Sequence, residues 1–155
     1  MRLSANFTLE ELTRSATAKA KGIDQTPSLD ALANLRRLAV ELEKVRALTG
    51  KPLKIHSGYR SPELNAAVGG AKQSFHLVGC AADFDPPSSW THDQLQQAIG
   101  ADPSIHFDLC LEEKARDGAH WLHFQVSRDG SVGRRLLKDA ELDRQGGAIS
   151  RITAG

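Results

Sequence analysis

The chain is short of several features that would assign it to a functional class directly. No apolar run approaches the length that spans a bilayer, so we expect no membrane insertion. The 20 Lys and Arg side chains nearly balance the 19 Asp and Glu side chains, and Arg134 with Arg135 is too short a basic stretch to bind nucleic acid. Cys80 and Cys110 match no zinc-binding cysteine spacing. We therefore expect two half-buried free thiols in a reducing compartment. A disulfide between them is the alternative.

The remaining composition is that of an ordinary globular protein. With 155 residues, the chain is long enough to bury one hydrophobic core, which predicts a single domain over 1–155 and a monomer. The clear patterns lie in residues 3–127, whereas residues 128–155 are weakly patterned and are expected to form a partly ordered tail. Residues 1–12 lack the apolar core of a secretory signal, so we expect a protein that is cytoplasmic until it is released.

The hydrophobic pattern predicts an α+β fold. Apolar residues recur every three or four positions from Leu29 to Leu48, which predicts an amphipathic helix capped by Ser28 and ended by Gly50. Shorter helices are predicted after Thr8 and in 61–70 and 91–100, strands in 53–57, 80–86, 105–112 and 120–127, and a loop in 18–27. This mixed order favours a small antiparallel sheet with flanking helices.

The segment SFHLVGCAADFDP, residues 74–86, places a histidine and an aspartate seven positions apart. The small residues between His76 and Asp83 allow a histidine on a loop and a carboxylate on a strand to converge. An ionised carboxylate in an apolar strand is costly unless it is paired or binds a metal ion. Catalytic zinc usually takes three protein ligands, so a third ligand is required.

The segment HWLHF offers two histidines for that third position. Residues three apart on a strand point to opposite faces, so only one of His120 and His123 faces the same cleft as the other ligands. His123 lies well inside the predicted strand and is the better ligand. His120, at the start of the strand, is expected to contact the ligands without binding the metal ion itself. The other histidines are interpreted as structural: His56, His92 and His106.

The segment SGYRSPELNAAVGGAKQSFHLVGCAADF resembles the core of the zinc D-alanyl-D-alanine carboxypeptidase family, which are peptidoglycan peptidases. The family pattern S-x-H-x-x-G-x-A-x-D is met by Ser74, His76, Gly79, Ala81 and Asp83. SGYRSPELN is similar to the arginine-bearing turn of the family, and HWLHFQV is similar to its W-x-H strand. The N-terminal segments are similar to a short, phage-associated branch: 3–15 and 26–52. The resemblance implies the hedgehog/DD-peptidase-like fold.

The resemblance also implies an active site. His76, Asp83 and His123 match the ligands of Zn²⁺, and Arg60 matches the arginine that stabilises the oxyanion of the tetrahedral intermediate. Ser74 matches a position that shapes the site through hydrogen bonds, with a plain turn serine as the alternative. Two aromatic residues are expected to line the substrate groove or to pack in the core: Tyr59 and Trp121.

The general base is the position at which this chain departs from the family. Many relatives carry an acidic residue three positions before the last ligand, where this chain has His120. A neutral imidazole accepts a proton near pH 7, so His120 is the first candidate. Glu112, which resembles an acidic position of phage-type relatives, is the second, and Glu113 and Asp117 remain alternatives.

The expected function is zinc-dependent hydrolysis of an amide bond in the peptide part of peptidoglycan, as a D,D-carboxypeptidase or as an endopeptidase of endolysin type. The resemblance implies action at the cell wall in a phage or prophage context. Two other functions stay open: a non-catalytic zinc-containing domain that binds cell-wall peptide or a protein partner, and a structural phage assembly protein. The unusual His120 supports the first, whereas a scaffold needs no convergent ligand set.

Overall fold

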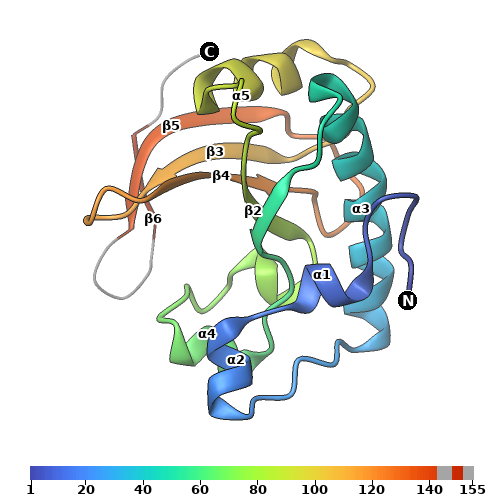
Figure 1. The fold of residues 1–155 in the computed structure, drawn as a ribbon, viewed down its shortest axis with the longest axis vertical. Coiled ribbons are helices and arrows are strands. Elements are labelled where there is room, and N and C mark those ends of the chain that lie inside the picture. Colours follow the sequence, from blue (N-terminus) through green and yellow to red (C-terminus); the bar gives the residue numbers. More distant parts are fainter. Residues whose placement is uncertain (143–147, 152–155) are drawn as a thin grey trace.

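The computed structural model describes residues 1–142 and 148–151, with side chains described up to residue 138. Within these residues the strands form one six-stranded sheet in the order β1-β2-β4-β3-β5-β6 (Figure 1). The strands are β1 Lys54–Ser57, β2 Ala81–Asp85, β3 Leu109–Lys114, β4 His120–Gln125, β5 Arg135–Leu142 and β6 Ala148–Arg151. The α+β prediction is confirmed. The sheet is not wholly antiparallel, because β5 pairs with β3 in parallel.

The helices lie on both sides of this sheet. They are α1 Leu9–Thr13, α2 Ala16–Lys21, α3 Leu29–Thr49, α4 Pro62–Ala67, the 3-10 helix η1 Phe75–Val78, and α5 His92–Ala101. Helix α5 lies over one face of the sheet, whereas α2 and α4 lie together on the other side (Figure 1). None of the described helices is long and apolar enough to cross a membrane.

The long helix α3 follows its predicted pattern closely. Ser28 caps it by accepting a hydrogen bond from the Ala31 backbone N–H (3.1 Å), and Gly50 ends it in the left-handed conformation with φ +68°. Leu35 and Leu42 are fully buried, and burial of such a side chain stabilises the fold by about 1.5–3 kcal/mol. Leu29, the first residue of the stripe, is 85% exposed and lies outside the core.

Two segments differ from the sequence predictions. The loop expected at 18–27 begins as helix α2, because Ser15 caps a run of alanine and lysine and Gly22 ends the helix in the left-handed conformation. The tail expected at 128–155 contains β5 and β6, which extend the sheet beyond β3. Residues 143–147 and 152–155 of that tail lie outside the described residues.

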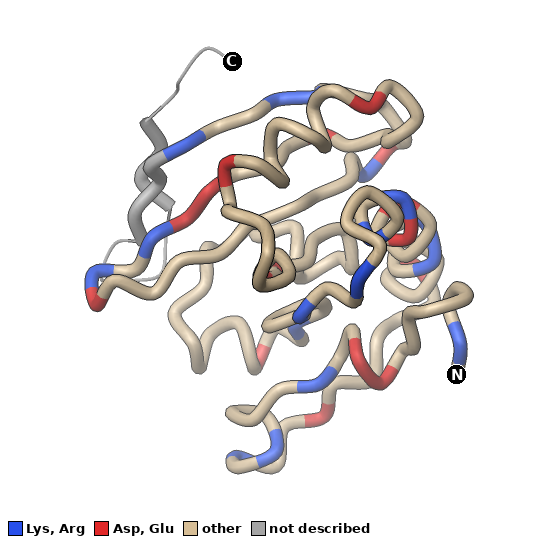
Figure 2. Tube along the Cα trace, turned by 45° about the horizontal axis from the view of Figure 1, so that its top comes forward, with Lys and Arg blue, Asp and Glu red and all other residues tan. Residues whose placement is uncertain are grey.

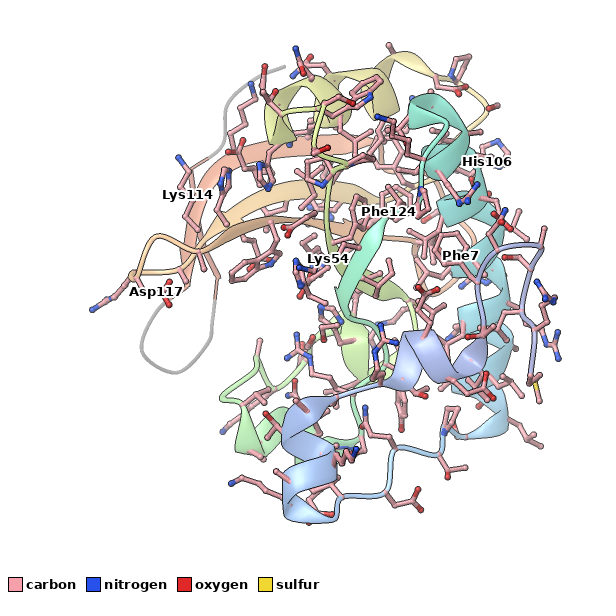
Figure 3. All side chains as sticks on the ribbon, viewed as in Figure 1. Phe7, Lys54, His106, Lys114, Asp117 and Phe124 are labelled. Carbon is pink, nitrogen blue, oxygen red and sulfur yellow. The ribbon has the colours of Figure 1, made fainter. Side chains whose placement is uncertain are left out.

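The two faces of the central strands have different characters. Side chains that point to α3 and α5 form the apolar core, which includes Phe84, Leu122 and Phe124. Of these, Phe124 is labelled in Figure 3. Cys80 and Cys110 are unpaired and fully buried, and burial raises the pKa of both thiols. The opposite face of the same strands carries polar side chains, and it is this face that positions the candidate site.

Charge is spread over the molecule without a dominant sign. Basic and acidic residues are interspersed along the described chain (Figure 2), in agreement with the near balance of the composition. Among the acidic residues, Asp117 lies at the tip of the β3–β4 hairpin, where its carboxylate accepts a hydrogen bond from the Ala119 backbone N–H (Figure 3). Its carboxylate is thus used in closing the turn.

Candidate metal centre

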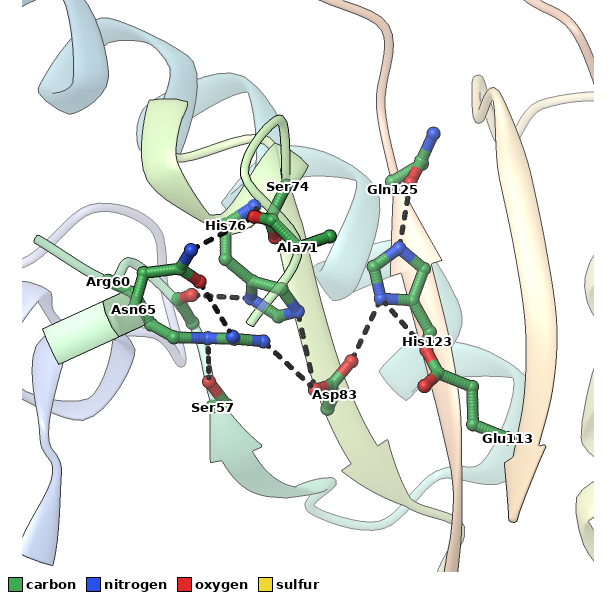
Figure 4. Close-up of polar contacts among 11 residues, drawn as sticks. Ser57, Arg60, Asn65, Ala71, Ser74, His76, Asp83, Glu113, His123 and Gln125 are labelled. Carbon is green, nitrogen blue, oxygen red and sulfur yellow. Dashed lines mark hydrogen bonds and ion pairs between the residues drawn. The ribbon is translucent and has the colours of Figure 1, made fainter. Parts of the chain in front are cut away.

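The structure brings His76, Asp83 and His123 together at one point. Their ligand atoms all lie within 4.8 Å of one another. Asp83 Oδ2 is 3.3 Å from His76 Nε2, and Asp83 Oδ1 is 3.0 Å from His123 Nδ1 (Figure 4). The three residues are only 2–9% exposed. A buried carboxylate between two imidazoles is a ligand set that suits a metal ion.

Local structure explains this convergence. Asp83 on β2 and His123 on β4 are cross-strand partners, so their side chains are neighbours on the same face of the sheet. His76 comes from η1, which Ser74 caps by accepting a hydrogen bond from the His76 backbone N–H (3.2 Å). Gly79 ends η1 with φ +76°, and a Cβ there would lie 2.5 Å from the Ala31 carbonyl oxygen. The glycine therefore lets η1 pack closely on α3 while His76 faces β2.

The second ring nitrogen of each imidazole, which faces away from Asp83, also has a hydrogen-bond partner. His76 Nδ1 lies 2.7 Å from the Gly58 carbonyl oxygen, and His123 Nε2 lies 2.7 Å from Gln125 Oε1. An imidazole that donates its outer N–H presents the lone pair of its other nitrogen to a metal ion, as metal-bound histidines usually do. Two nitrogens and one carboxylate oxygen then face a single point. This donor set fits zinc with a coordination position left open.

The charged groups in this cluster lie close enough to shift one another's pKa values. Burial opposes ionisation of Asp83, but His76 and His123 beside it hold the pKa of its carboxyl far below its usual range. Burial also opposes protonation of His123, yet the hydrogen bond and charge of Asp83 raise the pKa of His123 to about 9. Burial lowers the pKa of His76. Without a metal ion, His123 therefore carries a proton that a cation has to displace.

Arg60 lies beside the three ligands and is fixed in place. Its Nε donates to Ser57 Oγ (3.3 Å), its Nη1 donates to Asn65 Oδ1 (2.9 Å), and its Nη2 lies 4.0 Å from Asp83 Oδ2 (Figure 4). A Cβ at Gly70 would lie 2.5 Å from Arg60 Nη1, so a larger residue there would displace the end of this side chain. Burial lowers the pKa of Arg60 from its ordinary value. Since that value is very high, the guanidinium remains a cation.

A second carboxyl group reaches the same point from β3. Glu113 is 7% exposed, and its Oε1 lies 3.5 Å from His123 Nδ1. Burial and the nearby charge of Asp83 raise the pKa of Glu113 to about 7, against the opposing effects of His123 and Arg60. A carboxyl group beside a metal site with a pKa near neutrality has the properties of a general base.

The two leading candidates for the base lie elsewhere, and the prediction is corrected. On β3 and β4, side chains alternate between faces, so Glu113 and His123 share one face while Glu112 and His120 share the other. His120 Nε2 lies 2.8 Å from Glu112 Oε1, and the His120 ring stacks on His92 of α5 at 3.6 Å between centroids. Neither His120 nor Glu112 lines the cleft at the metal centre.

The ligands open into a cleft of about 590 Å³. Ser74, Tyr59 and Trp121 all line it, together with Arg60 and Glu113. Tyr59 is only 7% exposed and also packs in the core, so it presents little surface to the cleft. The indole Nε1 of Trp121 is buried and has no hydrogen-bond partner among the described residues.

Some residues of the site were not predicted from the sequence. Asn65 positions Arg60, and Gln125 contacts the outer nitrogen of His123. Gln125 lies two positions after His123 on β4, so strand alternation alone places it on the face of the ligands. No comparable sequence pattern indicates Asn65, because its contact with Arg60 depends on how α4 packs against the rest of the protein.

Comparisons with known proteins agree with this site. Residues 5–110 match the family described as peptidase M15. The zinc D-Ala-D-Ala carboxypeptidase of Streptomyces albus G is 37% identical over 80 residues, which are 51% of this chain and 31% of that protein. The chain thus matches less than a third of the length of this curated relative. The match to the family includes Arg60, His76 and Asp83, and it ends before Glu113 and His123.

Proposed function

Because the chain belongs to the peptidase M15 family, we propose that it is a zinc metallopeptidase that hydrolyses an amide bond in the peptide part of peptidoglycan. The observation that carries this proposal is the convergence of His76, Asp83 and His123 with Glu113 and Arg60 in one cleft. The relative from Streptomyces albus G, a zinc D-Ala-D-Ala carboxypeptidase, supports both zinc and this class of substrate.

The three ligands would hold the zinc ion, and two further residues would act on the substrate. When bound, zinc supplies Lewis acidity, which polarises the scissile carbonyl and eases deprotonation of a water molecule. Glu113 accepts the proton of the attacking water, because its carboxyl group lies beside His123 and has a pKa near neutrality. Arg60 faces the same point and stabilises the negative charge that develops on the carbonyl oxygen.

Proton balance is completed by the same carboxyl group. After attack, the proton on Glu113 passes to the leaving amine, so that the C–N bond breaks and Glu113 is ready for another cycle. Glu113 is only 7% exposed, so its carboxyl group is largely shielded from solvent during this transfer. The side chain thus serves first as base and then as acid.

The finer assignments rest on the resemblance in sequence. Both a D,D-carboxypeptidase and an endopeptidase of endolysin type are compatible with a cleft that is open to solvent. The likeness of 3–15 and 26–52 to the short phage-associated branch supports a phage or prophage enzyme, cytoplasmic until release and acting as a monomer at the cell wall. Ser74 and Trp121 would contact the bound peptide, since both line the cleft.

The non-catalytic alternative loses its main support. It depended on His120 in place of an acidic base. The structure supplies a carboxylate at the metal centre from Glu113 on β3 and directs His120 to the other face of the sheet. A binding domain has no need of a buried base beside its zinc ion.

The proposed function is tested by incubating zinc-loaded protein with purified peptidoglycan and identifying released products by mass spectrometry. We expect free D-alanine if the enzyme is a carboxypeptidase and cross-bridge or stem-peptide fragments if it is an endopeptidase. Metal-stripped protein serves as the control. Zinc-loaded protein that releases nothing from walls of different peptide chemistry would contradict the proposal.

Arg60→Met is expected to lower kcat by about 10²–10³-fold, which is the usual effect of removing one donor to a developing oxyanion. Zinc affinity should persist, because Arg60 is not one of the ligands. The comparison is with Arg36→Met, which removes an exposed arginine from α3. Steady-state kinetics separate the outcomes. A variant with an unchanged kcat and a raised KM would show that Arg60 only binds substrate.

A further inference from the structure

The orientation of His123 is determined by a chain of hydrogen bonds behind it. Its Nε2 lies 2.7 Å from Gln125 Oε1, and Gln125 Nε2 donates to Asp108 Oδ2 (2.7 Å). Gln125 is 6% exposed, and the Asp108 side chain is 15% exposed. Arg135 Nη2 donates to the same Asp108 oxygen (3.2 Å). The metal centre is thus connected through Gln125 and Asp108 to Arg135 at the start of β5.

The donor and acceptor roles in this chain follow from one another. A carboxylate only accepts hydrogen bonds, so the amide group of Gln125 has to direct its NH₂ toward Asp108. Its carbonyl oxygen then faces His123, and because a carbonyl also only accepts, His123 Nε2 has to carry a hydrogen. When the ring is neutral, its lone pair is thereby left on Nδ1, the nitrogen that faces Asp83 and Glu113.

We propose that Gln125 and Asp108 are positioning residues that fix His123 in the tautomer that binds the metal ion through Nδ1. This inference rests on the proposed zinc site and adds to it two residues that lie behind the outer nitrogen of His123. His76 is held differently, since its outer nitrogen lies against the Gly58 backbone carbonyl. Of the two histidines, it is therefore His123 whose outer nitrogen depends on a side chain that a substitution can remove.

Asp108 is well suited to act as the fixed end of the chain. Its backbone N–H donates to the Gln125 carbonyl oxygen (2.8 Å), and its own carbonyl accepts from the Arg135 N–H (2.9 Å). Asp108 and Gln125 are therefore held together by the backbone as well as by their side chains. Groups held in this way orient a ligand without the entropic cost of ordering it when metal binds.

The test uses the full chain and two measurements that do not depend on activity. Zinc affinity is measured by competition with a chromophoric chelator, and long-range ¹H–¹⁵N spectra of the zinc-loaded protein report which nitrogen of His123 carries hydrogen. We expect wild-type His123 to be protonated on Nε2. Gln125→Leu should weaken zinc binding by about 10–100-fold, as loss of such an outer partner usually does. Gln97→Leu, an exposed change on α5, is the control.

A double substitution separates positioning from packing. Gln125→Glu alone places two carboxylates together and should weaken zinc binding. Adding Asp108→Asn should restore it, because the introduced carboxylate accepts from both His123 Nε2–H and the introduced amide. The proposal is overturned if Gln125→Leu binds zinc like wild type with His123 still protonated on Nε2, or if the double variant fails to recover. Wild-type protein that binds no zinc would overturn the proposed function itself, and this inference with it.

Discussion

Glu113→Gln is expected to lower kcat by about 10²–10⁴-fold, the usual contribution of a general base. Glutamine keeps the size of the side chain but has no basic oxygen that accepts the proton of water. Zinc content should be unchanged, because Glu113 is not one of the three ligands. The measurement is steady-state peptide release together with the zinc content of each preparation.

Neighbouring residues on the same strands supply matched controls. Glu112→Gln makes the same chemical change one residue away, and His120→Gln removes the histidine that contacts Glu112. Both side chains lie on the other face of the sheet, so both variants should keep nearly wild-type kcat. If either control variant lost activity while Glu113→Gln stayed active, the general base would be the Glu112–His120 pair and not Glu113.

The pH profile gives a further readout for Glu113. Burial and Asp83 raise its pKa to about 7 in the metal-free protein, and a bound cation lowers it from there. A base has to be ionised to act, so kcat/KM of the wild type should fall on the acidic side with an apparent pKa below 7. This acidic limb should disappear from the residual activity of Glu113→Gln.

Asp83→Asn is expected to weaken zinc binding by more than about 100-fold and to abolish hydrolysis. Even groups outside the coordination sphere contribute 10–100-fold to metal affinity, and Asp83 is the only charged ligand of the three. The substitution conserves volume but removes the negative charge between two buried imidazoles. Asp85→Asn is the control, because this carboxylate on the same strand pairs with His56 and His92 outside the ligand set.

Zinc affinity should also depend on pH in a defined direction. The pKa of His123 is raised to about 9 without metal, so below that pH zinc has to displace one proton from the ring. The apparent affinity should therefore rise by about tenfold per pH unit as pH increases toward 9 and then level off. Chelator competition at several pH values measures this slope. A flat profile between pH 6 and 8 would show that the site binds without displacing that proton.

Most of the fold, and the candidate ligands His76 and Asp83, could be predicted from the sequence because they follow short-range patterns. The apolar period of α3, its Ser28 and Gly50 caps, and the spacing from His76 to Asp83 can each be interpreted locally. Strand β5 could not be predicted in this way. Its place in the sheet comes from parallel pairing with β3, a long-range contact that leaves little trace in local periodicity.

Two features of the sequence lead to different conclusions about the general base. Strand alternation already indicates that His120 and His123 point to opposite faces, whereas the position of His120 relative to the family pattern suggested a catalytic role. The structure follows the alternation. Glu113, an alternative in the sequence prediction, could be preferred over the other candidates only when the pairing of β3 with β4 was known, since its distance from His123 depends on register.

Titration of metal-stripped protein with zinc, followed by release of peptidoglycan products, tests the central claim most directly. We predict that activity rises in proportion to added zinc and reaches its maximum at one ion per chain, while Asp83→Asn stays inactive throughout. Full activity in metal-stripped protein, or a wild-type chain that binds one zinc ion and still cuts no wall peptide, would contradict the assignment of this cleft as a zinc peptidase centre.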